Sequence, residues 1–425
     1  MPRPEILLSR VTILYMAENA SHSAQSENGD DLAAQLAEKS ASLGFNFFGI
    51  IPARPAKRLE AYLDWIDREY HGAMGYLARP DRIVRRQDLN VILPGVQSII
   101  CVGLNYFPGK LPPEIAQDPS RGRISNYAWG VDYHDVMTPR LQELADWLNG
   151  QGNGRSQSRV YVDTGAILER DHGETAGFGF IGKNSLLINP RRGSWFFLGE
   201  ILTTTVLRQK EEGRKQKVSC GSCRRCQDVC PTAAFPQPYV LDGRRCISYL
   251  TIELKGWIPR NLRPLMGNWI YGCDLCQEVC PFNRFAKLTH EGNFYPETAR
   301  LKIKDWEAAS QSSIFNPQSF NTAAPPLLDI LALDEAGFRE RFARSPIKRI
   351  KRRRLVRNAC VAAGNWGSET AVPQLISLLS DPEPLLRGHA AWALLQIGGE
   401  RAETAVAQAR ATETDEAARG EMSFV

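Results

Sequence analysis

The sequence predicts a multidomain chain of the α+β/α/β class in three folded regions: an N-terminal α/β domain, a ferredoxin-like segment for two [4Fe–4S] clusters, and a C-terminal α-helical repeat. Three observations support this prediction. Helix-like and strand-like patterns alternate over residues 31–210, eight of the ten cysteines fall between Cys220 and Cys280, and a helical motif recurs near the C-terminus. A chain of 425 residues is too long for one core and usually divides into two or three domains.

The N-terminal region, residues 31–210, is predicted to form one α/β domain. We expect helices at residues 31–43, 61–70 and 139–148, and strands at 45–51, 96–104, 160–163 and 195–206. The preceding residues 1–30 carry an apolar run split by Ser9 and Arg10, with no clear cleavage site. We expect them to be a disordered leader.

Eight cysteines within residues 211–290 form the pattern of two [4Fe–4S] clusters. The first run, Cys220-x2-Cys223-x2-Cys226-x3-Cys230-Pro, is typical of bacterial two-cluster ferredoxins, in which the fourth cysteine of a run binds the other cluster. Cys246 and a second run complete the set. One cluster is therefore assigned to Cys220, Cys223, Cys226 and Cys280, and the other to Cys230, Cys246, Cys273 and Cys276.

Zinc binding and disulfides are the alternatives for these cysteines. Zinc sites close with four ligands and do not usually carry the third cysteine and the Cys-Pro of this pattern. Disulfide frameworks belong to small secreted domains, whereas clusters and free thiols favour a reducing cytoplasm. Cys101 and Cys360 lie outside the pattern in apolar segments, and we expect both to be buried core thiols.

The C-terminal part is predicted to be a HEAT-like helical repeat over residues 335–425, after an irregular connection at residues 291–334. Residues 355–364 resemble residues 385–394, and a second helix follows each copy, at 372–379 and 402–409. Two repeats are marginal alone, so we expect this part to pack on the rest of the chain.

A basic run begins the repeat. Seven of the ten residues from 348 to 357 are basic, although the whole chain carries a net charge of only +5. Such a run favours contact with a polyanion, usually nucleic acid; a solvated helix face or a flexible tail is the alternative. The residues are Lys348, Arg349, Lys351, Arg352, Arg353, Arg354 and Arg357.

Three shorter motifs could carry chemistry. Asp163 follows a predicted strand and precedes Gly165, a common place for a catalytic acid, although an N-cap is an equally good interpretation. The glycines of residues 177–182 match G-x-G-x-x-G without the expected strand and helix, so we interpret them as a loop that approaches a flat ligand. Asp132-Tyr-His134 begins like a cobalamin motif, but Met137 replaces its glycine.

Together these motifs resemble the epoxyqueuosine reductase family over nearly everything from residue 31 onward. Besides the two cysteine runs, the resemblance rests on segments that occur in the family's order. They are Leu93-Pro-Gly95, Tyr127-Ala-Trp-Gly-Val-Asp-Tyr-His134, Val162-Asp-Thr-Gly165, Gly179-Phe-Ile-Gly-Lys-Asn184, Gly193-Ser194, Leu198-Gly-Glu200 and Cys246-Ile-Ser-Tyr-Leu-Thr251.

The resemblance implies a reaction, cofactors and partners. The reaction is reductive removal of the epoxide oxygen of epoxyqueuosine at the tRNA wobble position, with the clusters passing electrons to a cobalamin and Asp163 donating a proton. The acid should be buried against the corrinoid. The implied partners are the anticodon stem-loop of queuosine tRNAs and a low-potential electron donor such as flavodoxin or ferredoxin. We expect a cytoplasmic monomer that does not bind membranes.

The resemblance also places ligand contacts on named residues. Corrinoid contacts are implied at Arg86, Ser125, Asp163, Leu187, Leu198, Asp274, Leu275 and Cys276. Candidates for tRNA phosphates are Arg170, Lys255 and the basic run. Two other functions stay open: a corrinoid reductase for a small molecule, similar to reductive dehalogenases, and an electron-transfer ferredoxin fused to a nucleic-acid-binding repeat.

Overall fold

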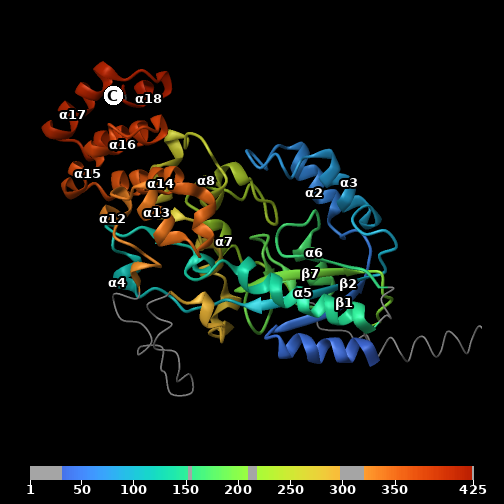
Figure 1. Cartoon of the computed structure of the whole chain (residues 1–425). Helices are drawn as coiled ribbons and strands as arrows, with labels where there is room; N and C mark the ends of the chain where they lie inside the picture. Colours follow the sequence, from blue (N-terminus) through green and yellow to red (C-terminus); the bar gives the residue numbers. More distant parts are fainter. Residues whose placement is uncertain (1–30, 152–155, 209–217, 297–319, 424–425) are drawn as a thin grey trace, which may run out of the picture.

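The computed structural model describes residues 31–151, 156–208, 218–296 and 320–423, drawn as coloured ribbons in Figure 1. The predicted leader, residues 1–30, lies outside the described residues. Within the described ranges, no helix is both long and apolar enough to cross a membrane.

A four-stranded sheet forms the centre of the N-terminal region. Its order is β1–β2–β7–β4, with β1 Phe47–Pro52, β2 Ser98–Asn105, β7 Phe196–Thr203 and β4 Ser158–Tyr161. The four strands lie where the sequence predicted them, but every neighbouring pair is antiparallel. The region is therefore better described as α+β than as α/β, because the latter implies parallel strands joined by crossover helices.

Apolar residues cover both faces of this sheet. On one face, Ile100 and Ile201 pack with Leu36 of the helix at residues 31–42 and with Leu141 of α5, Tyr133–Gln151. The opposite face forms a second core in which Ile99 and Cys101 pack under Phe178 and Leu187. The predicted burial of Cys101 is confirmed.

Shorter elements surround the sheet and build the cysteine-rich part. Two small strand pairs are antiparallel β5 Phe180–Ile181 with β6 Leu187–Ile188, and parallel β3 Arg123–Ile124 with β8 Trp269–Tyr271. The β3–β8 pair joins the N-terminal part to the cysteine-rich part. The helices are α2 Leu59–Asp67, α3 Pro80–Gln87, α4 Pro113–Ala116, α6 Glu169–Thr175, α7 Arg225–Asp228, α8 Ile247–Ile252 and α9 Leu275–Glu278.

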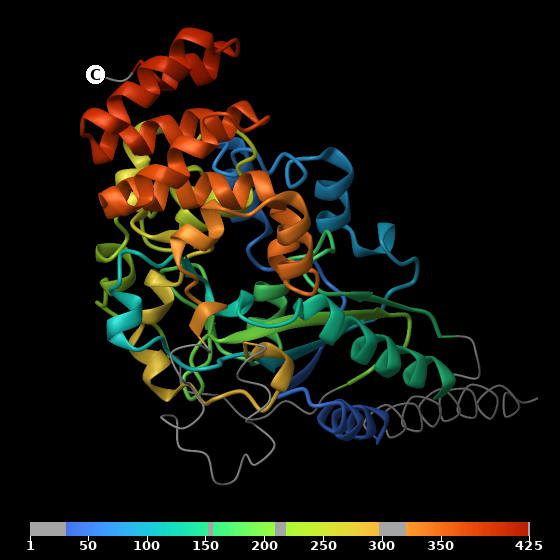
Figure 2. The same ribbon diagram turned by 60° about the vertical axis from the view of Figure 1, so that its left-hand side comes forward.

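The C-terminal helices stack at one end of the molecule in both ribbon views (Figures 1 and 2). Helices α14 Lys351–Trp366 and α16 Pro384–Ile397 are the repeated pair, and α15 Val372–Leu378 and α17 Glu400–Thr412 are their predicted partners. Helix α18 Glu416–Glu421 follows, and α12 Leu327–Leu331 and α13 Glu335–Phe342 precede them. Helix α12 falls in the predicted irregular connection, of which residues 297–319 are outside the described residues.

The helical repeat shares one hydrophobic core with the cysteine-rich part, as its small size predicted. Trp129, Leu250 and Ile270 lie in the same buried cluster as Leu355 and Trp392. The Asn358 amide donates to the carbonyls of Thr251 and Ile270, at 2.9 and 2.8 Å. Cys360 is fully buried, as predicted.

Two arginines of the basic run are also part of this buried contact, which corrects the prediction that they bind tRNA phosphates. Arg357 is 0% exposed and donates to the carbonyls of Leu250, Leu254 and Gly256, each at 2.7 Å. Arg352 is 9% exposed and pairs with Asp381 at 2.6 Å. Burial, followed by the charges of neighbouring arginines, lowers the pKa of Arg357 to about 9. Their donors face the protein interior.

We predict that Arg357→Leu lowers the free energy of unfolding by about 3 kcal/mol, because it leaves buried carbonyls without donors. The matched control is Lys351→Leu on the same helix, an exposed position expected to change stability by less than about 0.5 kcal/mol. Urea denaturation followed by far-UV circular dichroism measures both. An unchanged midpoint for Arg357→Leu would contradict the structural role.

Candidate active site and cluster ligands

The eight patterned cysteines are free thiols, all half-buried, and their division between two clusters stays a prediction. Burial, together with Cys220, Cys280 and Cys223, raises the pKa of the Cys226 thiol to about 11. Burial also raises the pKa of Cys276 well above its usual value, and the next largest causes are Cys246 and Cys230. Thiols that lie far apart in the sequence are therefore close enough to influence one another, as shared clusters would require.

Local structure around the thiols fits iron–sulfur ligation. Short helices α7 and α9 begin within the two cysteine runs, and backbone N–H groups point at sulfurs: Lys183 N to Cys220 Sγ and Ala234 N to Cys230 Sγ, both 3.4 Å. Among the described residues, no three His, Cys, Asp or Glu side chains converge closely enough to hold a single metal ion. A cubane instead distributes its four cysteines over four iron atoms.

Asp163 lies in the loop between β4 and α6. Its φ of 57° is in the left-handed region, which aspartate tolerates better than most residues. Tyr133 donates its hydroxyl to Asp163 Oδ2 at 2.7 Å, and the Asp163 backbone N–H donates to Glu169 Oε1 at 2.8 Å. The carboxylate itself is exposed, so the chain alone does not supply the predicted burial. These bonds hold the acid at the surface in a defined position.

Glu169 and Tyr133 are site residues that the sequence did not indicate. Burial raises the pKa of Glu169 well above its usual value, and the carboxylates of Asp163 and Glu200 add to this effect. Glu169 therefore favours the neutral form, whose carbonyl oxygen still accepts the Asp163 N–H. A glutamate in the first turn of the helix that follows the acid is the only sequence signal for it.

A line of tyrosines connects Asp163 to the cysteine-rich part. Tyr133 lies 6.3 Å from Tyr127 between ring centroids, and Tyr127 lies 5.9 Å from Tyr271. Tyr271 ends β8, and Gly272 and Cys273 follow it. Gly272 has a φ of 69°, and a Cβ there would meet the Ser125 Cβ at 2.5 Å, so only glycine fits.

The structure brings together two of the predicted corrinoid contacts, Ser125 and Asp274. The Ser125 hydroxyl and the Asn126 backbone N–H both donate to the buried Asp274 carboxylate, the second at 2.7 Å. Burial raises the pKa of Asp274 to about 7. Leu275 and Cys276 follow in α9, and Asn184 Nδ2 donates to the Cys276 carbonyl at 3.1 Å.

Arg86 of α3 has unused hydrogen-bonding capacity. It is 6% exposed, its guanidinium lies 4.7 Å from the centre of the Tyr62 ring, and its buried Nε has no hydrogen-bond partner. Its helix reaches the Asp163 loop, because Arg82 donates to the Thr164 carbonyl at 3.1 Å. An unpartnered buried donor on a helix that contacts the Asp163 loop fits a ligand rich in amide oxygens, such as a corrinoid.

The apolar contacts and the glycine motif have structural explanations. Leu187 is buried in the second core and Leu198 packs against it, so their role as corrinoid contacts stays a prediction. A Cβ on Gly179 would come within 2.0 Å of the Ile188 carbonyl oxygen. The glycines of this motif therefore permit close packing against β6 and need no ligand to explain them.

Among the remaining basic candidates, Arg349 lies near this site. Arg349 pairs with Asp132 at 2.7 Å, and its guanidinium lies 5.7 Å from the centre of the Tyr133 ring. Lys348, Lys351 and Lys255 are exposed, as is Arg170, which donates to the Ser185 carbonyl. Arg353 pairs with Glu383, and Arg354 donates to the carbonyls of Ile350 and Ile252. His134 contacts Asp132 at 3.0 Å.

Comparison with known proteins shows the family of the chain. Family models match residues 219–283 as a 4Fe-4S double cluster binding domain, 86–164 as epoxyqueuosine reductase QueG, DUF1730, and 351–423 as HEAT repeats. Epoxyqueuosine reductase of Salmonella typhimurium is 38% identical over 86% of this chain and 88% of its own length. The Escherichia coli protein of the same name is 37% identical over 86% and 90%. The chain belongs to the epoxyqueuosine reductase family.

Solved structures extend the family relationship to the fold. A selenomethionine-labelled epoxyqueuosine reductase has a TM-score of 0.79 and 30% identity, covering 92% of this chain and 97% of the other. A second structure holds a tRNA-Tyr epoxyqueuosine-modified stem loop, with a TM-score of 0.77, 31% identity and the same coverage. A Bacillus subtilis epoxyqueuosine reductase, also at 0.77 and 30% identity with the same coverage, has its aspartate catalytic loop swung out of the active site.

We predict that Cys280→Ala and Cys246→Ala each remove a different cluster. Because each variant takes one ligand from one cubane, each should lose about half of the bound iron. Iron analysis and the electron paramagnetic resonance spectrum of the remaining reduced cluster measure this. Cys360→Ala, which changes a buried core thiol, is the control and should keep the full iron content. Identical spectra for the two variants would contradict the assignment.

Proposed function

We propose that this chain reduces epoxyqueuosine to queuosine at the wobble position of tRNA. The family relationship supports this proposal, as does the relative that binds an epoxyqueuosine-modified stem loop. The observation that carries it is the placement of Asp163: its carboxylate is exposed, hydrogen-bonded to Tyr133, and linked through a line of tyrosines to Cys273. A proton donor and an electron path thus meet at one site.

A corrinoid would be held between the Asp163 loop and the start of α9. Arg86 and Ser125 would contact its polar substituents, Leu187 and Leu198 its ring, and the segment from Asp274 through Leu275 to Cys276 its edge nearest the clusters. When bound, a corrinoid supplies low-valent cobalt, a strong reductant for a strained epoxide.

The chain's own residues manage the protons of the reaction. Removal of an epoxide oxygen as water consumes two electrons and two protons, and the cyclopentane ring carries no acid of its own. Asp163 would donate to the departing oxygen. Tyr133 and Glu169 would keep its loop facing the substrate, which matters because the corresponding loop of the Bacillus subtilis relative is swung out of the active site.

Exposed cations near the acid would bind the tRNA backbone. Arg349 reaches the Tyr133 ring, so a phosphate contact there would lie beside the reacting nucleotide. Lys348, Lys351, Lys255 and Arg170 would extend this surface, and the wobble base would leave its stack to reach Asp163. This basic surface favours a tRNA substrate over the small molecule expected for the second candidate function, a small-molecule corrinoid reductase.

We predict that a host strain lacking this gene and any second reductase accumulates epoxyqueuosine in its tRNA, and that the intact gene restores queuosine. Asp163→Asn should not restore it, although the purified variant keeps its iron and binds corrinoid, because the amide cannot donate the proton. Nucleoside mass spectrometry measures both outcomes. Asp146→Asn, at an exposed carboxylate of α5, is the control and should restore queuosine. Normal queuosine with Asp163→Asn would make Asp163 a structural cap.

We predict that Glu169→Ala lowers kcat about tenfold, the effect of losing one hydrogen bond worth about 1.4 kcal/mol. Glu169→Gln should retain most activity, since its amide oxygen still accepts the Asp163 N–H. Single-turnover rates with a modified stem loop measure the difference. Equal losses in both variants would show that Glu169 acts as an acid rather than as a positioning residue.

A further inference from the structure

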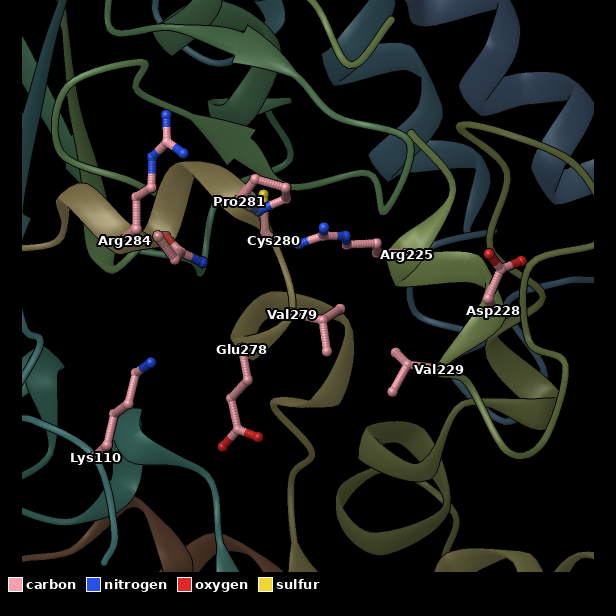
Figure 3. Close-up of a pocket in the computed structure, with 10 residues that line it drawn as sticks. Lys110, Arg225, Asp228, Val229, Glu278, Val279, Cys280, Pro281 and Arg284 are labelled. Carbon is pink, nitrogen blue, oxygen red and sulfur yellow. The ribbon is translucent and has the colours of Figure 1, made fainter. Parts of the chain in front are cut away.

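A surface cavity of about 670 Å³ lies between helices α7 and α9 (Figure 3). Val229, Val279 and Pro281 give it an apolar lining, and the cluster ligand Cys280 lies in its wall. Figure 3 shows Arg225 and Arg284 on either side of Cys280, with Lys110 facing the same space. We call this cavity the α7–α9 pocket. Its residues are separate from those of the Asp163 site.

The pocket adjoins Cys280, which is assigned to a different cluster from Cys273, the cysteine that follows the line of tyrosines. Cys273 and Cys276 belong to the other group and lie next to Asp274 and the line of tyrosines. Cys280 is grouped instead with the first cysteine run, whose neighbours Gly221, Ser222, Arg224 and Arg225 are exposed. When two clusters form one electron path, electrons enter at the cluster that is exposed and lies farther from the active site.

The charge of the pocket indicates the kind of donor. Lys110, Arg225 and Arg284 are exposed, and none has an ion pair among the described residues. Both lining acids are paired already: Glu278 with Arg123 at 2.8 Å and Asp228 with Arg224 at 3.7 Å. An apolar centre with unpaired cations around it is complementary to an acidic protein surface and would steer its approach.

We propose that the α7–α9 pocket is the docking site of an acidic one-electron carrier protein that reduces the cluster bound by Cys280. The proposal rests on the proposed function, which needs two electrons per turnover. Each docking event moves one electron: the carrier's cofactor is oxidised by one electron and the cluster is reduced by one. Two successive events supply the reaction.

The test compares holoprotein variants with an acidic flavodoxin in its hydroquinone form. Arg225→Glu/Arg284→Glu reverses two pocket charges, and Arg401→Glu/Arg410→Glu reverses two exposed charges on α17 as the matched control. Stopped-flow absorbance, without tRNA, follows the reduction of the clusters at low and at high salt. We expect the pocket variant to be slowed about tenfold at low salt and the difference to shrink at high salt. Dithionite should reduce all three proteins equally fast.

Several outcomes would overturn the proposal. The first is that flavodoxin reduces all three proteins at the same rate. The second is that the pocket variant is slowed as much with dithionite as with flavodoxin. The third is that the pocket variant binds a tRNA stem loop more weakly while its rate of reduction by flavodoxin is unchanged. Lys110→Glu repeats the test at a residue outside the cysteine runs, so that no neighbour of a cluster ligand is changed. An unchanged rate of reduction by flavodoxin in this variant would also contradict the docking proposal. The experiment measures cluster reduction and needs no turnover of tRNA. The docking result would therefore remain valid even if the chain did not reduce epoxyqueuosine.

Discussion

The two hydrogen bonds of the Asn358 amide are the contact on which the rest of the arrangement depends. They fix α14 simultaneously to Thr251, at the end of α8, and to Ile270 in β8. Strand β8 ends at Tyr271, and Gly272 and Cys273 follow it, so a helix of the repeat is bound to the strand that precedes a predicted cluster ligand. The Arg357 guanidinium strengthens the same contact through three carbonyls of the cysteine-rich part. The repeat is therefore part of the redox framework as well as an appended surface.

The basic run shows why composition alone predicted too many tRNA contacts. Seven cations in ten residues suggest a solvated polyanion site, but α14 has a buried face on which Arg352 precedes Val356 by four residues and Arg357 precedes Val361 by four. Helical spacing could have shown that these two arginines lie on apolar faces. The partners of Arg357 could not have been predicted, because the carbonyls of Leu250 and Leu254 come from a segment about a hundred residues away.

The candidate site was predictable where it depends on local pattern and unpredictable where it depends on tertiary contact. The strand positions follow from spacing and are confirmed. The cysteine groups and the role of Asp163 rest on spacing and family motifs and stay predictions. The direction of the strands could not be predicted from the sequence, since helix-like and strand-like segments alternate in both parallel and antiparallel sheets. Nor could Tyr133, thirty residues before Asp163, although its hydroxyl fixes one carboxylate oxygen. The motif that contains Tyr133 and the motif that contains Asp163 were both visible in the sequence, but only the fold shows that these two residues are in contact.

A macromolecular substrate gives a physical reason for the two-cluster design. If a tRNA stem loop covers Asp163, the same face cannot also receive a carrier protein, so electrons must enter elsewhere. The second cysteine group lies beside the tyrosines of the active site, while Cys280 opens onto the α7–α9 pocket. Two clusters can carry electrons over the distance between the face that binds the carrier protein and the face that binds the tRNA. On the proposed docking, the pocket cations, which have no ion pair within the described part of the chain, would serve a partner other than tRNA. Each partner would then have its own basic surface.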